Sequence, residues 1–175
     1  MSRGLFIGRF QPFHNGHLYA IKKILGREDE IVIVIGSAQE SFSLKNPLSA
    51  GERIEIIRAV LRELNALGRS IIVPIPDIHE NLVWPARVIE YTPKFDRVYS
   101  GNELVLVLFE QFGIETVRLE HINRNEYQGK VIRTKIIKGE DWAYLVPKVV
   151  YNYLEEIGFE ERIRRLVKHY SEVNL

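Results

Sequence analysis

The stretch GLFIGRFQPFHNGH, residues 4–17, decides the fold. It begins with a short apolar run at 4–8 that shows no polar alternation, which is typical of a strand covered on both faces. A loop of polar and turn-forming residues follows at once and holds His14, Gly16 and His17. The stretch therefore predicts a buried first strand that delivers a polar loop at its carboxyl end.

The rest of the chain repeats this alternation of short apolar runs and longer amphipathic segments. The runs are rich in β-branched residues, and the longer segments place apolar residues at helical spacing. Strands and helices in turn indicate right-handed βαβ units and a parallel sheet. We predict strands at 4–8, 30–36, 70–75, 97–100 and 115–119, and helices at 17–25, 52–67, 80–91 and 103–112.

This pattern predicts an α/β fold: a Rossmann-like, doubly wound, parallel five-stranded sheet with helices on both faces. Beyond residue 128 the pattern is helical only, with breaks at Pro147 and Gly158. A chain of 175 residues with 46% hydrophobic content is long enough to close one sizeable core. We therefore expect one domain, with an α/β core at 1–127 and a C-terminal helical cap at 128–175.

Charge and cysteine content exclude several classes of function. The chain has 24 basic and 23 acidic residues, so no bulk field attracts nucleic acid or an anionic membrane, and we expect neither as a partner. The absence of cysteine excludes disulfides, cysteine-ligated zinc and cysteine nucleophiles, and fits a reducing compartment. No apolar stretch approaches the length of a membrane span or a signal peptide. We expect a cytoplasmic protein.

Polar residues gather where the predicted strands end. In a doubly wound sheet, ligands bind beyond the carboxyl ends of the strands, near the point where strand order reverses. The first four strands deliver segments that hold most of the Gly, Ser, Asn and His of the chain. These segments are GRFQPFHNGH (8–17), GSAQESFSLKNPLSAGER (36–53), PDIHENLVW (76–84) and YSGNE (99–103).

The loop after the first strand predicts a site for an anion. It has neither of the two common glycine-rich phosphate patterns. Gly16 instead allows a close backbone approach at a helix start, where N–H groups and the dipole favour an anion. His14 and His17 can face the same place and hold phosphoryl oxygens, whether neutral or protonated. Two alternatives stay open: a surface or capping pair, and a zinc pair, for which no further ligands stand at a recognisable spacing.

Several of these segments resemble a known family. Residues 14–17 have the HxGH pattern of the nucleotidyltransferase superfamily. The longer segments GRFQPFHNGH, GSAQ (36–39), NPLSAGER (46–53) and VYSGN (98–102) resemble those of archaeal-type nicotinamide-nucleotide adenylyltransferases, and the resemblance runs from residue 4 to about 167. It implies an enzyme of NAD biosynthesis that transfers AMP from ATP to nicotinamide mononucleotide (NMN), giving NAD and pyrophosphate.

Other functions remain as alternatives. Sister HxGH enzymes include phosphopantetheine adenylyltransferase and the cytidylyltransferases, which are not expected to carry the mononucleotide-reading set described below. A non-catalytic regulator that binds NAD or ATP on the same fold is a further alternative. A histidine-ligated metal hydrolase lacks the remaining ligands.

The resemblance implies that the first loop binds the triphosphate of ATP. His17 would contact the α-phosphate of ATP and His14 the leaving phosphates, with Mg²⁺ bound through the ATP phosphates and no metal-ligating residues in the chain itself. Arg9 would add a cationic fork, and Gly8 and Phe10 would allow close backbone approach.

Two later segments complete the implied ATP site. In YQGKVIR, residues 127–133, Arg133 corresponds to the family's β,γ-phosphate contact, although Gln128 and Lys130 stand where the family has hydroxyl residues. Gly101 and Asn102 would line the adenine and ribose pocket. For these two, a turn glycine followed by an Asn helix cap is the structural alternative.

The resemblance implies that residues after the third strand bind the mononucleotide and select it. The resemblance assigns the nicotinamide ring to Trp84 through a cation–π contact, the carboxamide to Asn81 and the backbone of Ile78, and the ribose hydroxyls to Asp77. The structural alternative is a capping box of Asp77 and Glu80 with Trp84 in the core.

The second strand end completes the implied NMN site. Lys45 stands where the family usually has arginine for the NMN phosphate, and Ser37 belongs to the GSA turn. Ser49 and Glu52 form a capping box that needs no functional explanation. The resemblance also implies a homo-oligomer, with a hexamer as the candidate assembly.

Overall fold

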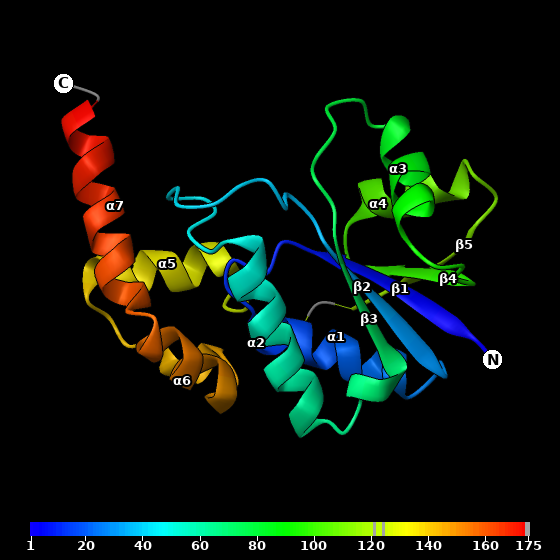
Figure 1. The fold of residues 1–175 in the computed structure, drawn as a ribbon, viewed down its shortest axis with the longest axis horizontal. Helices are drawn as coiled ribbons and strands as arrows, with labels where there is room; N and C mark the ends of the chain where they lie inside the picture. Colours follow the sequence, from blue (N-terminus) through cyan, green and yellow to red (C-terminus); the bar gives the residue numbers. More distant parts are fainter. Residues whose placement is uncertain (121, 124, 174–175) are drawn as a thin grey trace.

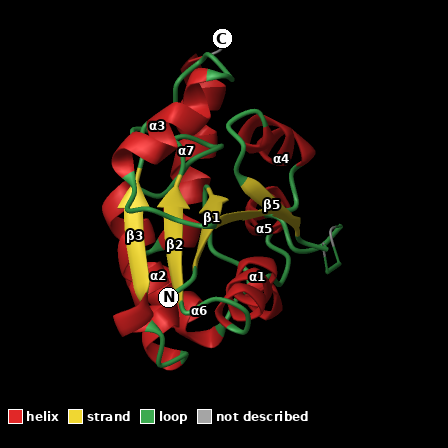
Figure 2. Ribbon diagram, turned by 90° about the vertical axis from the view of Figure 1, so that its right-hand side faces the viewer, coloured by secondary structure: helices red, strands yellow, loops and turns green. Residues whose placement is uncertain are grey.

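The structure is a computed structural model and describes residues 1–120, 122–123 and 125–173. Its centre is a parallel sheet of five strands in the order β3-β2-β1-β4-β5. Figure 2 shows β3, β2 and β1 side by side. Every strand lies within one residue of its predicted range, because the apolar runs are short and bounded by polar loops. The strands are β1 (Arg3–Gly8), β2 (Glu30–Ile35), β3 (Ser70–Pro74), β4 (Arg97–Ser100) and β5 (Glu115–Arg118).

Helices cover both faces of the sheet, as the sequence predicts (Figure 1). Four connect the strands, and three follow the last strand in the C-terminal part. The helices are α1 (Asn15–Leu25), α2 (Ala50–Glu63), α3 (Val83–Tyr91), α4 (Glu103–Glu110), α5 (Gly129–Lys138), α6 (Lys148–Glu156) and α7 (Phe159–Val173), and short 3₁₀ turns lie at Leu67–Arg69 and Ala143–Leu145.

Strand β2, which lies between β3 and β1, shows how the two layers are built. Ile31, Ile33 and Ile35 belong to the larger core beneath α1, α2 and the C-terminal helices, whereas Val32 and Val34 belong to a smaller core beneath α3 and α4. Successive residues of a strand point to opposite faces, so an uninterrupted apolar run is required here. The larger core also contains residues from the C-terminal segment. The boundary between an α/β core at 1–127 and a helical cap at 128–175 stays a prediction.

The first two helices differ from their predicted ranges at one or both ends. The first begins at Asn15 rather than His17, and its N-cap is His14. The second ends at Glu63 instead of reaching residue 67, and Asn65, with φ of 51°, turns the chain in the left-handed region.

The third and fourth helices are shorter than predicted. The third begins at Val83 rather than residue 80, and the fourth ends at Glu110 rather than residue 112. Because the third helix starts late, with Leu82 as its N-cap, the alternative of an Asp77–Glu80 capping box is wrong. Across the described residues, no helix is both long and apolar enough to cross a membrane.

Candidate active site

A pocket of about 420 Å³ opens at the carboxyl ends of β1 and β4. These strands are neighbours in the sheet, and the chain runs outward from β1 to β2 and β3 but returns to the other side of β1 for β4 and β5. The pocket therefore lies at the point where strand order reverses, as the sequence predicts. Its walls include Arg9 after β1 and Ser100 at the end of β4.

Three helix N-termini meet at this pocket. Gly16 and His17 from the first turn of α1, Asn102 from the N-cap of α4, and Gly129 from the start of α5 all line it. Each N-terminus carries main-chain N–H groups and the positive end of a helix dipole. The backbone alone thus makes the pocket favourable for an anion with several negative groups.

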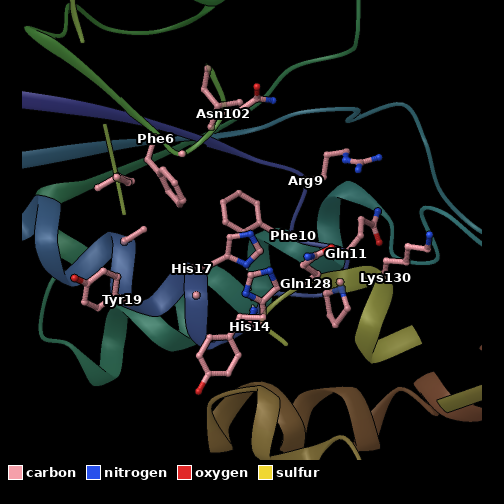
Figure 3. Close-up of a pocket in the computed structure, with 18 of the residues that line it drawn as sticks. Phe6, Arg9, Phe10, Gln11, His14, His17, Tyr19, Asn102, Gln128 and Lys130 are labelled. Carbon is pink, nitrogen blue, oxygen red and sulfur yellow. Dashed lines mark hydrogen bonds between the residues drawn. The ribbon is translucent and has the colours of Figure 1, made fainter. Parts of the chain in front are cut away.

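The two motif histidines lie stacked in the pocket (Figure 3). Their ring centroids are 3.7 Å apart, and the main-chain N–H of His14 donates to Nδ1 of His17 at 3.2 Å. On its other side the His17 ring packs against Phe10 at 4.6 Å and Phe13 at 5.3 Å. The imidazole of His17 is therefore held by rings on two sides and by one hydrogen bond.

Burial keeps both histidines neutral in the free protein. It lowers the pKa of His14 to about 4. Burial, followed by the proximity of His14, lowers the pKa of His17 well below its ordinary value. Because Nδ1 of His17 accepts a hydrogen bond, its neutral ring carries the proton on Nε2. Nδ1 of His14 is buried and has no hydrogen-bond partner among the described residues.

Arg133 is fixed at the edge of the pocket. Its guanidinium donates to the main-chain oxygen of Gln11 in the first loop. Burial, with a smaller contribution from the charge of Arg9, lowers the pKa of Arg133 to about 10, so it remains a cation at neutral pH. Lys45 and Lys130 also line the pocket, where Glu120 is the acidic lining residue. The lining therefore carries more positive than negative charge.

The structure brings together nearly the whole predicted ATP set. Its members that line the pocket are Arg9, Phe10, His14, His17, Gly101, Asn102 and Arg133. Gly8 does not line it: a Cβ there would lie 2.8 Å from the Phe10 ring, so the glycine makes room for that ring. The cap alternative at Asn102 is confirmed, since its side chain accepts from the N–H of Leu104 at 3.0 Å. Gln128 and Lys130 also line the pocket and are exposed.

The predicted NMN set is divided in the structure. Lys45 lies in the pocket with the histidines, whereas Ser37, Asp77, Ile78, Asn81 and Trp84 do not line it. The hydroxyl and the main-chain N–H of Ser37 donate to the two carboxylate oxygens of Asp77 at 2.6 and 3.0 Å. This pair joins the ends of β2 and β3, and it uses the carboxylate that the alternative capping box would have required.

The remaining members of the NMN set lie after β3. Trp84 is partly buried against the smaller core, Ile78 is partly buried and Asn81 is exposed. Their roles toward NMN stay predictions. The capping box of Ser49 and Glu52 is confirmed by its two reciprocal hydrogen bonds.

Arg53 is a structural residue that the sequence reasoning missed. Its side chain is fully buried and donates to the main-chain oxygens of Arg9, Gly36 and Ser37, as well as to those of Glu40 and Ser49. It thereby joins the loops after β1 and β2. A signal was present, because Arg53 stands four residues before Ile57 on the apolar stripe of the helix, where a charged residue is rare.

Gln11 is a second residue that was missed. Its side-chain amide donates to the main-chain oxygen of Leu48 at 2.8 Å and accepts from the N–H of Leu48 at 2.9 Å. The first loop is therefore attached to the segment that precedes α2. Nothing in the local sequence pattern indicates this pairing over 37 positions.

The described residues contain no group of three or more His, Asp or Glu side chains arranged to hold a metal ion. The pocket instead presents several cationic side chains and helix N-termini. Such a lining suits phosphate oxygens.

Comparison with known proteins gives consistent results. Residues 5–140 match the family model "Cytidylyltransferase-like". The nicotinamide-nucleotide adenylyltransferase of Methanococcus aeolicus is 52% identical over 94% of this chain and 94% of its own length. The enzyme of the same name from Saccharolobus solfataricus is 46% identical over 95% of this chain and 98% of its own.

A solved structure shares the fold. A bifunctional NMN adenylyltransferase/ADP ribose pyrophosphatase from Francisella tularensis, crystallised with AMP and a manganese ion, superposes with a TM-score of 0.80 at 23% identity. The alignment covers 98% of this chain and 53% of that one, so the chain spans about half the length of the bifunctional protein. The HxGH motif, the pocket at the switch point and these relatives lead to one conclusion: the chain belongs to the nicotinamide-nucleotide adenylyltransferase family of HxGH nucleotidyltransferases.

Proposed function

We propose that this chain transfers the AMP moiety of ATP to NMN, forming NAD and releasing pyrophosphate. The observation that supports it most is the convergence of three helix N-termini, two stacked histidines and several cationic side chains on one pocket. A polyphosphate is the ligand that such a lining favours. NMN as the acceptor is inferred from the name of the relatives, such as the nicotinamide-nucleotide adenylyltransferase that is 52% identical to this chain.

The reaction needs positioning more than acid–base chemistry. The attacking phosphate of NMN is already ionised, so no protein base has to remove a proton. Charge grows on the phosphate oxygens in the transition state, and preorganised donors stabilise it. In our proposal the Nε2–H of His17 is such a donor to the α-phosphate, since Nδ1 is held by the backbone.

We assign the leaving phosphates to the other side of the pocket. His14, Arg9 and Arg133 would contact the β- and γ-phosphates, and Arg133 is already fixed by Gln11. Gly101 and Asn102 would line the adenosine. Gly8 and Phe10 shape the first loop, so we assign them a supporting role.

We propose Mg²⁺ as the metal, held through the ATP phosphates. The family resemblance supports a metal carried by the nucleotide, and the Francisella tularensis protein of the same fold was crystallised with AMP and a manganese ion. When bound, the ion would neutralise part of the phosphate charge.

We place NMN between the pocket and the end of β3. Lys45 would bind its phosphate beside the histidines. Asp77, held by Ser37, would contact the ribose, and Asn81 with the backbone of Ile78 would contact the carboxamide. Trp84 would stack on the charged pyridinium ring, which attracts an aromatic face.

We also propose that the enzyme is cytoplasmic and assembles as a homo-oligomer, with a hexamer as the candidate. The absence of cysteine supports the first proposal, and the family resemblance supports the second. Size-exclusion chromatography with light scattering would measure the assembly.

One assay tests the function. Purified protein is incubated with ATP, Mg²⁺ and NMN, and NAD and pyrophosphate are measured by chromatography and a coupled assay. We expect equal amounts of both products. Turnover of phosphopantetheine, or of CTP with an alcohol phosphate, without NAD formation would assign the chain to a sister enzyme. Binding of NAD and ATP without turnover of any pair would indicate a regulator.

A further inference from the structure

Arg162, on the C-terminal helix α7, contacts the segment that carries Lys45. Its two terminal nitrogens donate to the carboxylate oxygens of Glu52 at 2.8 and 2.7 Å, and one of them also donates to the main-chain oxygen of Pro47 at 3.2 Å. Only 16% of the Arg162 side chain is exposed, against 19% for Glu52. This is a bidentate, largely desolvated ion pair rather than a surface contact.

Arg162 reaches the same segment on the other side of Lys45. Its guanidinium lies over the ring of Phe42, 4.6 Å from the centroid. The contacts at Phe42 and Pro47 therefore flank Lys45, which is itself exposed. A planar guanidinium can pair with a carboxylate and stack on a ring at once, and a lysine ammonium cannot copy both contacts.

The segment that carries Lys45, residues 42–48, is also attached to the first loop, at its C-terminal residue Leu48. Leu48 is held by both hydrogen bonds of the Gln11 amide, and Gln11 also accepts from Arg133 through its main-chain oxygen. Glu52 is fixed by the N–H of Ser49 at 2.9 Å. Residues 42–48 thus connect α7 to the first loop. Lys45 lies in the sequence between Phe42, which contacts Arg162, and Leu48, which is bound by Gln11.

We propose that Arg162 is a positioning residue for Lys45, and that α7 thereby sets the affinity of the site for the NMN phosphate. The proposal rests on the proposed function. Without Arg162 the segment keeps its attachment at Leu48 but loses both contacts that flank Lys45. Holding Lys45 in one place then costs more conformational entropy when the phosphate binds.

The test compares Arg162→Met with Arg165→Met, which removes an exposed cation from the same helix. We expect Arg162→Met to raise KM for NMN about tenfold, with KM for ATP and kcat within about twofold. Arg162→Lys should give an intermediate KM, and Arg165→Met should match the parent protein. An unchanged KM for NMN in Arg162→Met, or an equal rise in both KM values, would overturn the proposal.

A double variant separates positioning from general stability. Lys45→Met alone should raise KM for NMN, and adding Arg162→Met should then have little further effect, because Arg162 acts through Lys45. If the rise in KM for NMN in the double variant equals the product of the two single rises, Arg162 acts independently of Lys45, and the proposal is overturned.

A measurement without substrates keeps this test distinct from the proposed function. Trypsin cleaves after Lys45 when the segment opens, so Arg162→Met should be cut there several times faster than Arg165→Met under conditions in which both remain folded. If the parent protein forms no NAD, the proposed function fails while this comparison still reports on Arg162. Equal cleavage rates would refute the contact between α7 and the segment as a restraint on Lys45.

Discussion

The main-chain N–H of His14 donates to Nδ1 of His17 while the two imidazole rings lie stacked with centroids 3.7 Å apart. The hydrogen bond fixes which nitrogen of His17 carries the proton, and the stack fixes the plane of its ring. A donor that is oriented before the substrate arrives loses little free energy in reorganisation during the reaction.

Replacement of His17 should therefore reduce turnover without unfolding the protein. We expect His17→Ala to lower kcat by about a hundredfold or more, the usual loss when one preorganised donor is removed. His17→Gln, whose amide nitrogen lies near the position of Nε2, should retain more activity than His17→Asn. Steady-state kinetics with circular dichroism as the folding control would check this. Near-normal turnover of His17→Ala would refute the assignment.

His14 should make stability depend on pH. In the folded protein its pKa is about 4, against an ordinary value of 6.5, so between these pH values the unfolded chain binds a proton that the folded chain does not. The free energy of unfolding should therefore fall as the pH decreases from about 6.5 to about 4, by on the order of 3 kcal/mol from this group.

The control is the variant His14→Gln, which cannot titrate. Its free energy of unfolding, measured by urea denaturation from pH 7 to pH 4, should decline less steeply than that of the parent protein. Parallel curves for the two proteins would show that His14 is not held neutral in the fold.

Gly129 at the start of α5 should not accept a side chain. An added Cβ would lie 2.5 Å from the main-chain oxygen of Gln11 and 3.0 Å from Nη1 of Arg133. We expect Gly129→Ala to lower the free energy of unfolding by about 2 kcal/mol and kcat/KM by at least tenfold, because the helix start and the arginine must both move. Gly68→Ala is a matched control, since nothing lies within 4 Å of its added Cβ. Equal results for both variants in denaturation and kinetics would contradict this prediction.

Trp84 should affect NMN more than ATP. Trp84→Leu keeps an apolar side chain against the smaller core but removes the aromatic face. We expect KM for NMN to rise about tenfold, as expected for the loss of a cation–π contact of about 1–2 kcal/mol, with KM for ATP unchanged. A lower melting temperature with an unchanged KM for NMN would assign Trp84 to the core alone.

The strands and the position of the pocket could be predicted from the sequence for a physical reason. Strands buried on both faces must be apolar throughout, and β2 at Glu30–Ile35 is a clear case. In a doubly wound parallel sheet, ligands bind where strand order reverses, so the loop containing His14 and His17 was expected at the site.

Contacts between distant segments could not be predicted in the same way. The pattern of Asp77 and Glu80 allowed a local capping box as an alternative, but Ser37, forty positions away, uses the Asp77 carboxylate instead. The pairing of Gln11 with Leu48 has no local signature either. The neutral state of His14 depends on burial, which a four-residue motif does not reveal.

The hydrogen bonds of Arg53 end on main-chain oxygens of five residues, one in the loop after β1 and four in the connection between β2 and α2. A main-chain oxygen is present whatever side chain the residue bears. Side chains in these loops can therefore be exchanged without removing the acceptors that hold the loops together. For protein engineering, this means that a library varied at Arg9 and Glu40 should still yield folded proteins, as long as Arg53 is kept.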